Sequence, residues 1–194
     1  SAEQSEWPPH SWSSRSILAV ESLHTATTTS ADCSTKSKAR FADERRAVKL
    51  LDANILLYAY DGSSEHHDVC RQWLEDTLQA DEPVGLPWQT LLAFVRISTS
   101  SRAFRSPLKV SHATEVVSQW LARPQVVIVE PGERFWVIFN EQVKSAQISG
   151  PLVTDATLAS MAIEQGATLC STDRHFTRFE SLHRFDPTNA KREA

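Results

Sequence analysis

The feature that most constrains the fold is an alternation, from residue 48 onward, between short apolar runs and longer stretches of helical periodicity. The apolar runs lie at 48–51, 84–86, 126–129 and 168–171. Between them, apolar residues recur at the three- and four-residue spacing of a single helix face, as they do over 67–80. Strands separated by helices predict a mostly parallel sheet covered on both faces, a three-layer α/β/α sandwich.

Local signals also predict where some of these elements begin and end. Ser111 is expected to cap one helix, and Thr154 or Asp155 is expected to cap another that stops at Gly166. The continuous β-branched run at 126–129 predicts a strand that is buried on both faces. A last short piece at 183–185 is expected to add an edge strand.

The composition changes near residue 47. Residues 1–46 are rich in Ser and Thr and then in charged residues, and few of their apolar residues repeat at any period. Such a segment cannot bury much apolar surface, so we expect a disordered extension there. Residues 47–194 are expected to form one domain, because a chain of 194 residues leaves little room for two.

Charge, cysteines and hydropathy restrict the class of protein. A net charge of −4 argues against a protein that coats nucleic acid by bulk charge, but it allows a local basic rim. Cys33, Cys70 and Cys170 are far apart and have no zinc-binding spacing, so we expect reduced, structural thiols. No apolar run approaches the roughly 18 residues of a membrane span, so we expect a cytoplasmic protein with no membrane association.

Three aspartates are placed where a parallel sheet binds ligands. Asp52 and Asp173 each follow a predicted strand, and Asp155 opens a predicted helix after the apolar residues 151–153. Ligands bind outside the carboxyl ends of parallel strands, so folding would bring the three carboxylates together. Close carboxylates repel one another and raise their pKa values, which a divalent cation would relieve. All-oxygen ligands suit Mg²⁺, or alternatively Mn²⁺, rather than zinc.

Each aspartate taken alone also has a purely structural interpretation. An Asp before a helix is most often its N-cap, which is the favoured account of Asp155 considered singly. Asp52 could form a turn, and Asp173 could cap the short helix that follows it. The shared position of all three at one rim of the sheet favours a functional site.

The motifs around these aspartates resemble those of PIN-domain ribonucleases, and in particular the VapC toxins of toxin–antitoxin pairs. The resemblance spans about residues 48–187 and rests on several motifs in the family's order. They are LLDANILLYAY at 50–60, GLPW at 85–88, LAFVR at 92–96, LVTDATLA at 152–159 and STDRHF at 171–176.

This resemblance implies metal-dependent hydrolysis of phosphodiester bonds in RNA. It implies that Asp52 and Asp155 bind the metal with help from Asp173, and that Asn54 and Thr172 support these carboxylates. It also implies a small cognate antitoxin that silences the enzyme, and a homodimer.

One position departs from the family pattern. Most PIN domains carry a Glu on the helix after the second strand, where this sequence has Ala93. Asp61 or Glu65 are possible replacements, although nothing in the sequence places them. The chain could therefore also be a weakened module that binds RNA or an antitoxin without cutting.

A second alternative is a haloacid-dehalogenase-like phosphatase, which also begins with an apolar strand that ends in Asp. Those enzymes need a second Asp two positions on, where this chain has Asn54, and a later Lys that neither Asp155 nor Asp173 has nearby. The sequence therefore favours the nuclease.

A basic stretch without acidic residues runs from Arg96 to Lys109 and includes Arg102 and Arg105, with Phe104 available for stacking on a base. It could hold RNA phosphates beside the acidic site. It could equally be a solvated loop whose charges aid solubility.

Overall fold

Within residues 48–189, which the computed structural model describes, five strands form one sheet in the order β3-β2-β1-β4-β5. The strands are β1 (Lys49–Leu51), β2 (Val84–Pro87), β3 (Val126–Val129), β4 (Thr168–Cys170) and β5 (Arg184–Phe185). All four neighbouring pairs are parallel. The expected parallel sheet is therefore confirmed, while the predicted extension at 1–46 lies outside the described residues.

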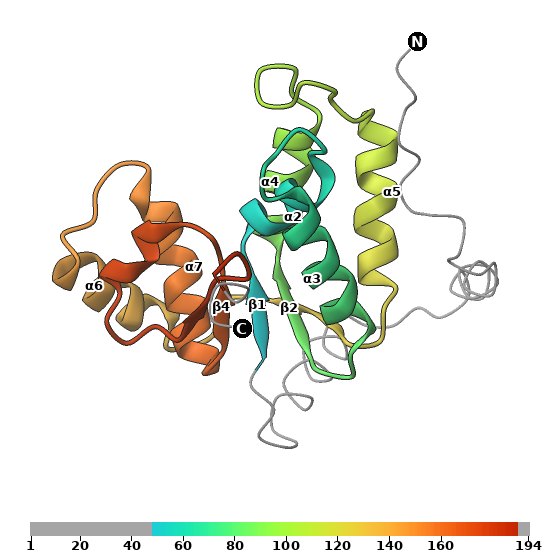
Figure 1. Ribbon diagram of the computed structural model, residues 1–194. Helices are drawn as coiled ribbons and strands as arrows, with labels where there is room; N and C mark the ends of the chain where they lie inside the picture. Colours follow the sequence, from blue (N-terminus) through green and yellow to red (C-terminus); the bar gives the residue numbers. More distant parts are fainter. Residues whose placement is uncertain (1–47, 190–194) are drawn as a thin grey trace, which may run out of the picture. The chain divides into compact units, whose positions relative to one another are not determined.

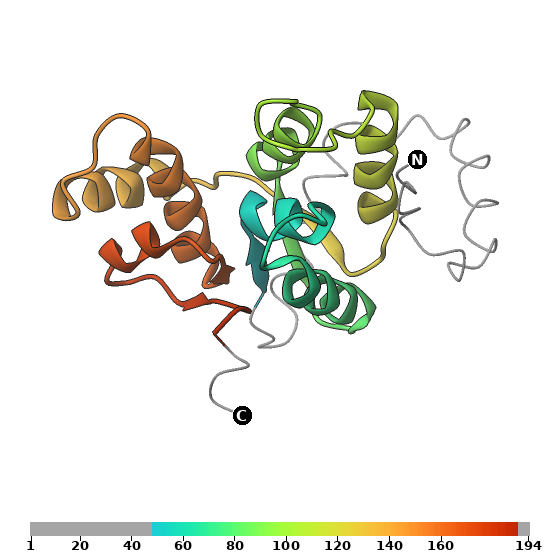
Figure 2. The ribbon, with the colours of Figure 1, turned by 45° about the horizontal axis from the view of Figure 1, so that its top comes forward.

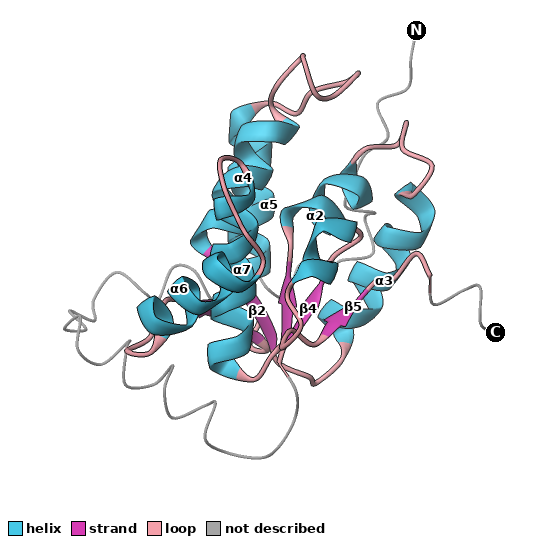
Figure 3. Ribbon diagram, turned by 90° about the vertical axis from the view of Figure 1, so that its left-hand side faces the viewer, coloured by secondary structure: helices cyan, strands magenta, loops and turns pink. Residues whose placement is uncertain are grey.

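The helices form the outer two layers. They are α2 (Ala53–Tyr60), α3 (His67–Gln79), α4 (Trp88–Ser98), α5 (Val110–Leu121), α6 (Phe135–Ser145), α7 (Leu152–Gln165) and the 3₁₀ helix η3 (Arg174–Arg178). Figure 1 shows α2 to α5 on one side of the strands, and α6 and α7 on the other. In Figure 3, β2, β4 and β5 lie beneath these helices. The structure thus has the predicted α/β/α layers.

The central strand β1 is the most deeply buried part of the sheet. Leu50 and Leu51 have no exposed surface, because β2 and β4 pair with β1 on its two sides. The hydroxyl of Thr90 on α4 donates to the carbonyl oxygen of Leu51 at 3.0 Å. This buried hydrogen bond ties the start of α4 to the carboxyl end of β1. The rim of the sheet where Asp52 lies is therefore fixed both by the strands that pair with β1 and by α4.

An aromatic cluster joins the helices α2, α4 and α5 on one face of the sheet. The ring centroids of Phe94 and Trp120 are 4.8 Å apart, and Tyr60 lies 5.3 Å from Phe94 in an edge-to-face arrangement. Such pairs stabilise a core beyond the apolar area that they bury. The cysteines Cys70 and Cys170 are also buried and free, as expected, while Cys33 lies outside the described residues.

Two expected helix caps are wrong, and one expected helix end is right. Helix α5 begins at Val110, so Ser111 lies inside its first turn. Helix α7 begins at Leu152, which places Asp155 within the first turn and frees its side chain from capping. At the other end of α7, Gly166 has a φ of 61° and ends the helix in the left-handed conformation that glycine adopts without strain.

Strand β3 is not buried on both faces as predicted. It ends the strand order, so it has a single neighbour, and Val127 and Ile128 remain half-buried. A continuous apolar run indicates a buried strand in most parallel sheets, but it does not reveal which strand lies at the edge. By contrast, the short strand β5 at the other edge was expected from the sequence.

Candidate functional site

Asp52 stands at the carboxyl end of β1, where its carboxylate is bound from both sides. One oxygen, Oδ1, accepts the backbone N–H of Ala53 at 2.6 Å and caps α2. The other, Oδ2, accepts the hydroxyl of Ser171 at 2.7 Å. Each carboxylate oxygen has a further lone pair. Asp52 therefore caps α2 rather than forming a turn, and its carboxylate remains able to bind a ligand.

Ser171 organises the centre, and sequence reasoning missed it. Its Oγ accepts a hydrogen bond from Nδ2 of Asn54 at 2.9 Å and another from the backbone N–H of Asp173 at 3.0 Å. With both lone pairs occupied, its single proton is directed to Asp52. Thr172 was expected in this supporting role beside Asn54. The hydrogen bonds described here come from Ser171 instead, and Asn54 supports Asp52 through it.

The carboxylates of Asp155 and Asp173 lie close together, on the segments that precede and follow β4. Asp155 belongs to the first turn of α7, whereas Asp173 caps η3 by accepting the backbone N–H of His175 at 2.8 Å. Figure 2 shows α7 beside the red C-terminal segment that contains η3, and the two elements are in contact. A helix that leads into a parallel strand starts at the strand's carboxyl edge, which explains why Asp155 reaches this rim.

His175 is a second residue that sequence reasoning missed. Its Nδ1 lies 3.3 Å from Oδ1 of Asp173 and 3.9 Å from Oδ2 of Asp155. One ligand atom from each of these three residues lies within 4.8 Å of the others. The group contains Asp155 and Asp173 but not Asp52. The assignment of the metal to Asp52 and Asp155 therefore stays a prediction.

The three aspartates influence one another electrostatically. The pKa of Asp52 is raised from 3.8 to about 6, first by burial and then by the charges of Asp155 and Asp173, while the hydrogen bonds from Ser171 and Ala53 act in the opposite direction. The pKa of Asp155 is also raised, first by burial and then by Asp173, while His175 and Arg178 act in the opposite direction. Burial is the largest cause of both shifts, and the neighbouring carboxylates add to it.

These residues fit a divalent cation. Carboxylate oxygens are the ligands that Mg²⁺ and Mn²⁺ prefer. Oδ1 of Asn54 is a buried acceptor with no hydrogen-bond partner among the described residues. A buried acceptor is seldom left in this state, and a cation or a bound water beside Asp52 would satisfy it. The donor set and this unsatisfied oxygen both favour a metal centre.

The residues considered as substitutes for the missing Glu lie elsewhere. Ala93 is half-buried on α4 and offers no ligand atom. Asp61 follows the last residue of α2, and its Oδ1 accepts the backbone N–H of Ser63. Since α2 begins directly after Asp52, its eight residues separate Asp61 from the centre by about 12 Å. Glu65 is exposed and lies near His66. Neither Asp61 nor Glu65 belongs to the metal-ligating group among the described residues, which consists of Asp155, Asp173 and His175.

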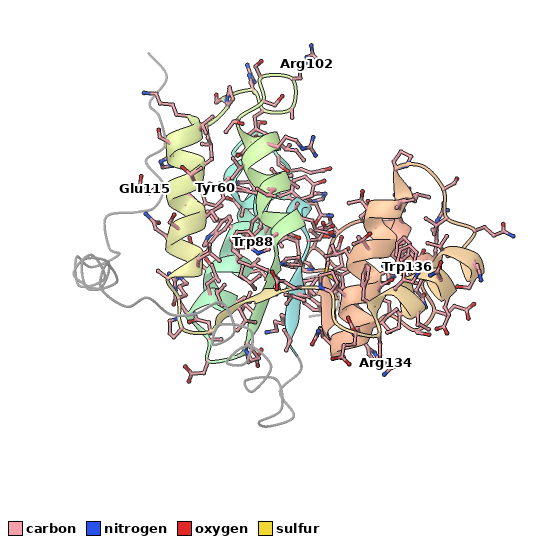
Figure 4. The ribbon with its side chains drawn as sticks, turned by 180° about the vertical axis from the view of Figure 1, so that it is seen from behind. Tyr60, Trp88, Arg102, Glu115, Arg134 and Trp136 are labelled. Atoms are coloured by element: carbon pink, nitrogen blue, oxygen red, sulfur yellow. The ribbon has the colours of Figure 1, made fainter. Side chains whose placement is uncertain are left out.

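The basic stretch begins with Arg96 in the last turn of α4 and continues into the loop that leads to α5. Figure 4 shows Trp88 at the start of this helix and Arg102 on the loop past its other end. The side chains of Arg96, Arg102 and Arg105 are exposed, and none has an ion-pair partner within residues 48–189. Phe104 is only 5% exposed, so its predicted stacking on a base is wrong. It packs beneath the loop because the loop folds back to bury it.

Comparison with known proteins identifies the family. The sequence profile of the PIN domain matches residues 49–182. The chain belongs to the PIN domain family. This membership agrees with a three-layer fold and with aspartates at the carboxyl rim of the sheet, and it leaves the dehalogenase-like alternative without support.

Individual PIN-domain relatives agree with this assignment. The chain is 40% identical over 135 residues to Ribonuclease VapC37 of Mycobacterium tuberculosis, covering 70% of this chain and 94% of that protein. It is 37% identical over 132 residues to VapC ribonuclease Mb2897 of Mycobacterium bovis, covering 68% and 90%.

Solved structures share the PIN fold. VapBC2 from Rickettsia felis, bound to a promoter DNA fragment, matches with a TM-score of 0.54 at 20% identity, over 72% of this chain and 98% of that one. VapBC-1 from nontypeable Haemophilus influenzae matches with a TM-score of 0.54 at 17% identity, over 73% and 98%. At such identities the likeness establishes the fold alone. Among the described residues, no helix combines the length and apolar character needed to cross a membrane.

Proposed function

We propose that this chain is a metal-dependent endoribonuclease that acts as the toxin of a toxin–antitoxin pair. The observation that carries the proposal is the convergence of Asp52, Asp155 and Asp173 at one rim of a PIN fold, where the charge of Asp173 helps to raise the pKa values of both Asp52 and Asp155. The names of the relatives, which are VapC ribonucleases, point to RNA as the substrate.

The residues of the centre divide the work of binding and positioning. A bound Mg²⁺ or Mn²⁺ would polarise the scissile phosphate and lower the pKa of bound water, which makes hydroxide available near neutral pH. Asp52, Asp155 and Asp173 are the groups that would hold this ion. Ser171 fixes the orientation of Asp52 and favours its ionised form, because the hydroxyl donates to the carboxylate.

Asn54 positions Asp52 indirectly, through Ser171. Its Nδ2 donates to Ser171 and so directs the Ser171 proton toward Asp52. Its Oδ1 is buried and has no hydrogen-bond partner among the described residues. Groups that orient metal ligands in this way commonly influence metal affinity and activity strongly. Thr172 remains a candidate for such a role.

RNA would approach over the exposed arginines of the last turn of α4 and of the α4–α5 connection. Arg96, Arg102 and Arg105 have no carboxylate partner within the described residues, so they are available to phosphates. Phosphate contacts of this kind position an RNA strand without reading its sequence. The cleavage site would then be determined by contacts closer to the metal.

Protein partners have apolar surface to bind. Large apolar side chains are exposed on the helices α4, α5, α6 and α7: Trp88, Leu92, Val110, Trp136, Val137 and Val153. Contiguous exposed apolar surface commonly marks an interface, and Trp136 and Val137 are consecutive residues of α6. It supports the two partners that the family implies, a second copy of the chain and a small antitoxin. A cytoplasmic location, where such a pair would act, remains an expectation.

Controlled expression tests the proposal directly. The wild-type chain should arrest growth and cleave RNA, and purified protein should need Mg²⁺ or Mn²⁺ for cleavage. Asp52→Asn should abolish both effects, because the variant loses a charged metal ligand. The matched control is Asp68→Asn, which makes the same substitution at an exposed position on α3 and should behave as wild type.

Other outcomes would point to the alternatives. Equal toxicity of wild type and Asp52→Asn would refute the enzymatic proposal. Binding of RNA or antitoxin without cleavage, with intact folding, would favour the weakened binding module that Ala93 suggests. Turnover of small phosphate esters with RNA left intact would favour a phosphatase.

A further inference from the structure

The metal-ligating group among the described residues includes a nitrogen atom that can bind a metal, in the imidazole ring of His175. The residue lies on η3, two positions after Asp173, and its backbone N–H donates to Oδ1 of that aspartate at 2.8 Å. This bond holds the backbone of His175 against the carboxylate. The side chain then places Nδ1 at 3.3 Å from the same oxygen and 3.9 Å from Oδ2 of Asp155.

These separations are compatible with ligand atoms that bind the same ion. A charge-assisted N–H···O bond is about 2.7–2.9 Å long, which is shorter than either distance. In an octahedral site with bonds of about 2.1 Å, adjacent ligands are about 3.0 Å apart and opposite ligands about 4.2 Å apart. Both observed distances are shorter than the separation of about 4.2 Å between opposite ligands of such a site.

The accessibility and chemistry of the group also allow metal binding. The side chains of His175, Asp155 and Asp173 are 54%, 24% and 38% exposed, so an ion can reach them from solvent.

We propose that Nδ1 of His175 binds the metal together with Asp155 and Asp173, so that this site takes Mn²⁺ in preference to Mg²⁺. Imidazole nitrogen binds transition metals, whereas Mg²⁺ strongly favours oxygen ligands. The proposal rests on the metal dependence proposed above, and it specifies which ion the centre selects and which residue makes the selection.

Metal binding without RNA tests this assignment. Titration calorimetry should show tighter binding of Mn²⁺ than of Mg²⁺ to the wild-type chain. His175→Ala should weaken Mn²⁺ binding by about tenfold or more, on the scale of losing a ligand contact, and should change Mg²⁺ binding far less. His175→Asp, with an oxygen donor in place of nitrogen, should bind Mg²⁺ well and lose the preference for Mn²⁺.

A spectroscopic measurement adds a direct readout. Pulsed electron paramagnetic resonance of bound Mn²⁺ should detect coupling to a coordinated nitrogen in the wild type and none in His175→Ala. The control is His183→Ala, because His183 is exposed beside β5 and should leave both the coupling and the preference unchanged.

The failure of this inference can be separated from that of the proposed ribonuclease. Absence of nitrogen coupling in the wild type would overturn it, as would equal weakening of both ions in His175→Ala. Metal-dependent RNA cleavage that persists alongside either result would leave the proposed function standing. Conversely, nitrogen coupling without cleavage would support the His175 assignment and count against the ribonuclease.

Discussion

The Ser171 hydroxyl donates to Oδ2 of Asp52 at 2.7 Å, although the two residues are 119 positions apart in sequence. Asp52 follows β1 and Ser171 follows β4, and these strands are neighbours in the sheet. The carboxyl ends of two strands that are adjacent in the sheet therefore build the most buried part of the acidic centre. Ser171 has only 4% of its surface exposed, so water does not easily replace its hydrogen bonds.

Replacing Ser171 by Ala should weaken metal binding in a pH-dependent way. Without the donated hydrogen bond, the pKa of Asp52 rises above its wild-type value, and more metal-binding sites are protonated near neutral pH. Stability should fall by about 1–3 kcal/mol, because partners of the hydroxyl are left unsatisfied. Calorimetric titration with Mn²⁺ between pH 6 and 8 measures the effect. Ser171→Thr, which keeps a hydroxyl, should retain the wild-type profile, and an unchanged profile in Ser171→Ala would contradict the role assigned to Ser171.

The metal-free protein should become less stable as pH rises between about 4 and 6. The pKa of Asp52 is raised from 3.8 to about 6, so in this window the folded state binds a proton that the unfolded state has released. The stabilisation is complete below the unfolded pKa and is lost as pH rises through the folded one, and Asp155 acts in the same direction. The loss assigned to Asp52 is about 1–3 kcal/mol.

Urea unfolding at a series of pH values in the presence of a chelator checks this dependence. Asp52→Asn cannot ionise, so its stability should vary less across the same window. Saturating Mn²⁺ should remove the loss, since the ion stabilises the ionised carboxylates of the folded state. A wild-type stability that rises from pH 4 to 6 without metal would show that other groups dominate.

Removing two arginines from the α4–α5 connection should weaken RNA binding without affecting the metal. In the double variant Arg102→Ala and Arg105→Ala, the dependence of log affinity on log salt should become shallower by about 0.7 for each lost phosphate contact. Fluorescence anisotropy with a short single-stranded RNA, at several salt concentrations, measures it. The control, Lys144→Ala with Arg184→Ala, makes the same change in net charge at exposed positions elsewhere. Equal effects of both pairs would favour a loop that serves solubility.

Gly85→Ala should destabilise the fold at the centre of β2. An added Cβ would lie 2.7 Å from Cγ2 of Val129 and 3.3 Å from Cγ1 of Val48, both of which are buried. Overpacking of this kind costs about 1–3 kcal/mol, measurable by urea or thermal unfolding. Gly62→Ala is the control, because a Cβ there has no atom within 4 Å, and its effect should stay within about 0.5 kcal/mol. Similar effects of the two substitutions would contradict the close packing of β2 against β3.

Some features of the site could be predicted from the sequence, because they depend on residues that are close together in the chain. Asp52 and Asp173 follow apolar runs that are strands, and the structure places both at the carboxyl rim. Ser171 had a local signal that went unused. It precedes Asp173 by two positions at the end of β4, and side chains two apart in extended chain point to the same side. His175 had no such signal, because the sequence does not show that a 3₁₀ helix turns its ring toward Asp155.

The sequence by itself determined the succession of strands and helices along the chain, the parallel sheet and the aspartates as candidate ligands. These follow from apolar periodicity and from the position of polar residues at strand ends, which are properties of neighbouring residues. Tertiary structure alone decided that β3 lies at an edge, that Phe104 is buried, that Ser171 serves Asp52 and that His175 joins Asp155 and Asp173. Each of these depends on the packing of segments that are remote in sequence. Such contacts produce no periodic pattern of residues from which they could be predicted.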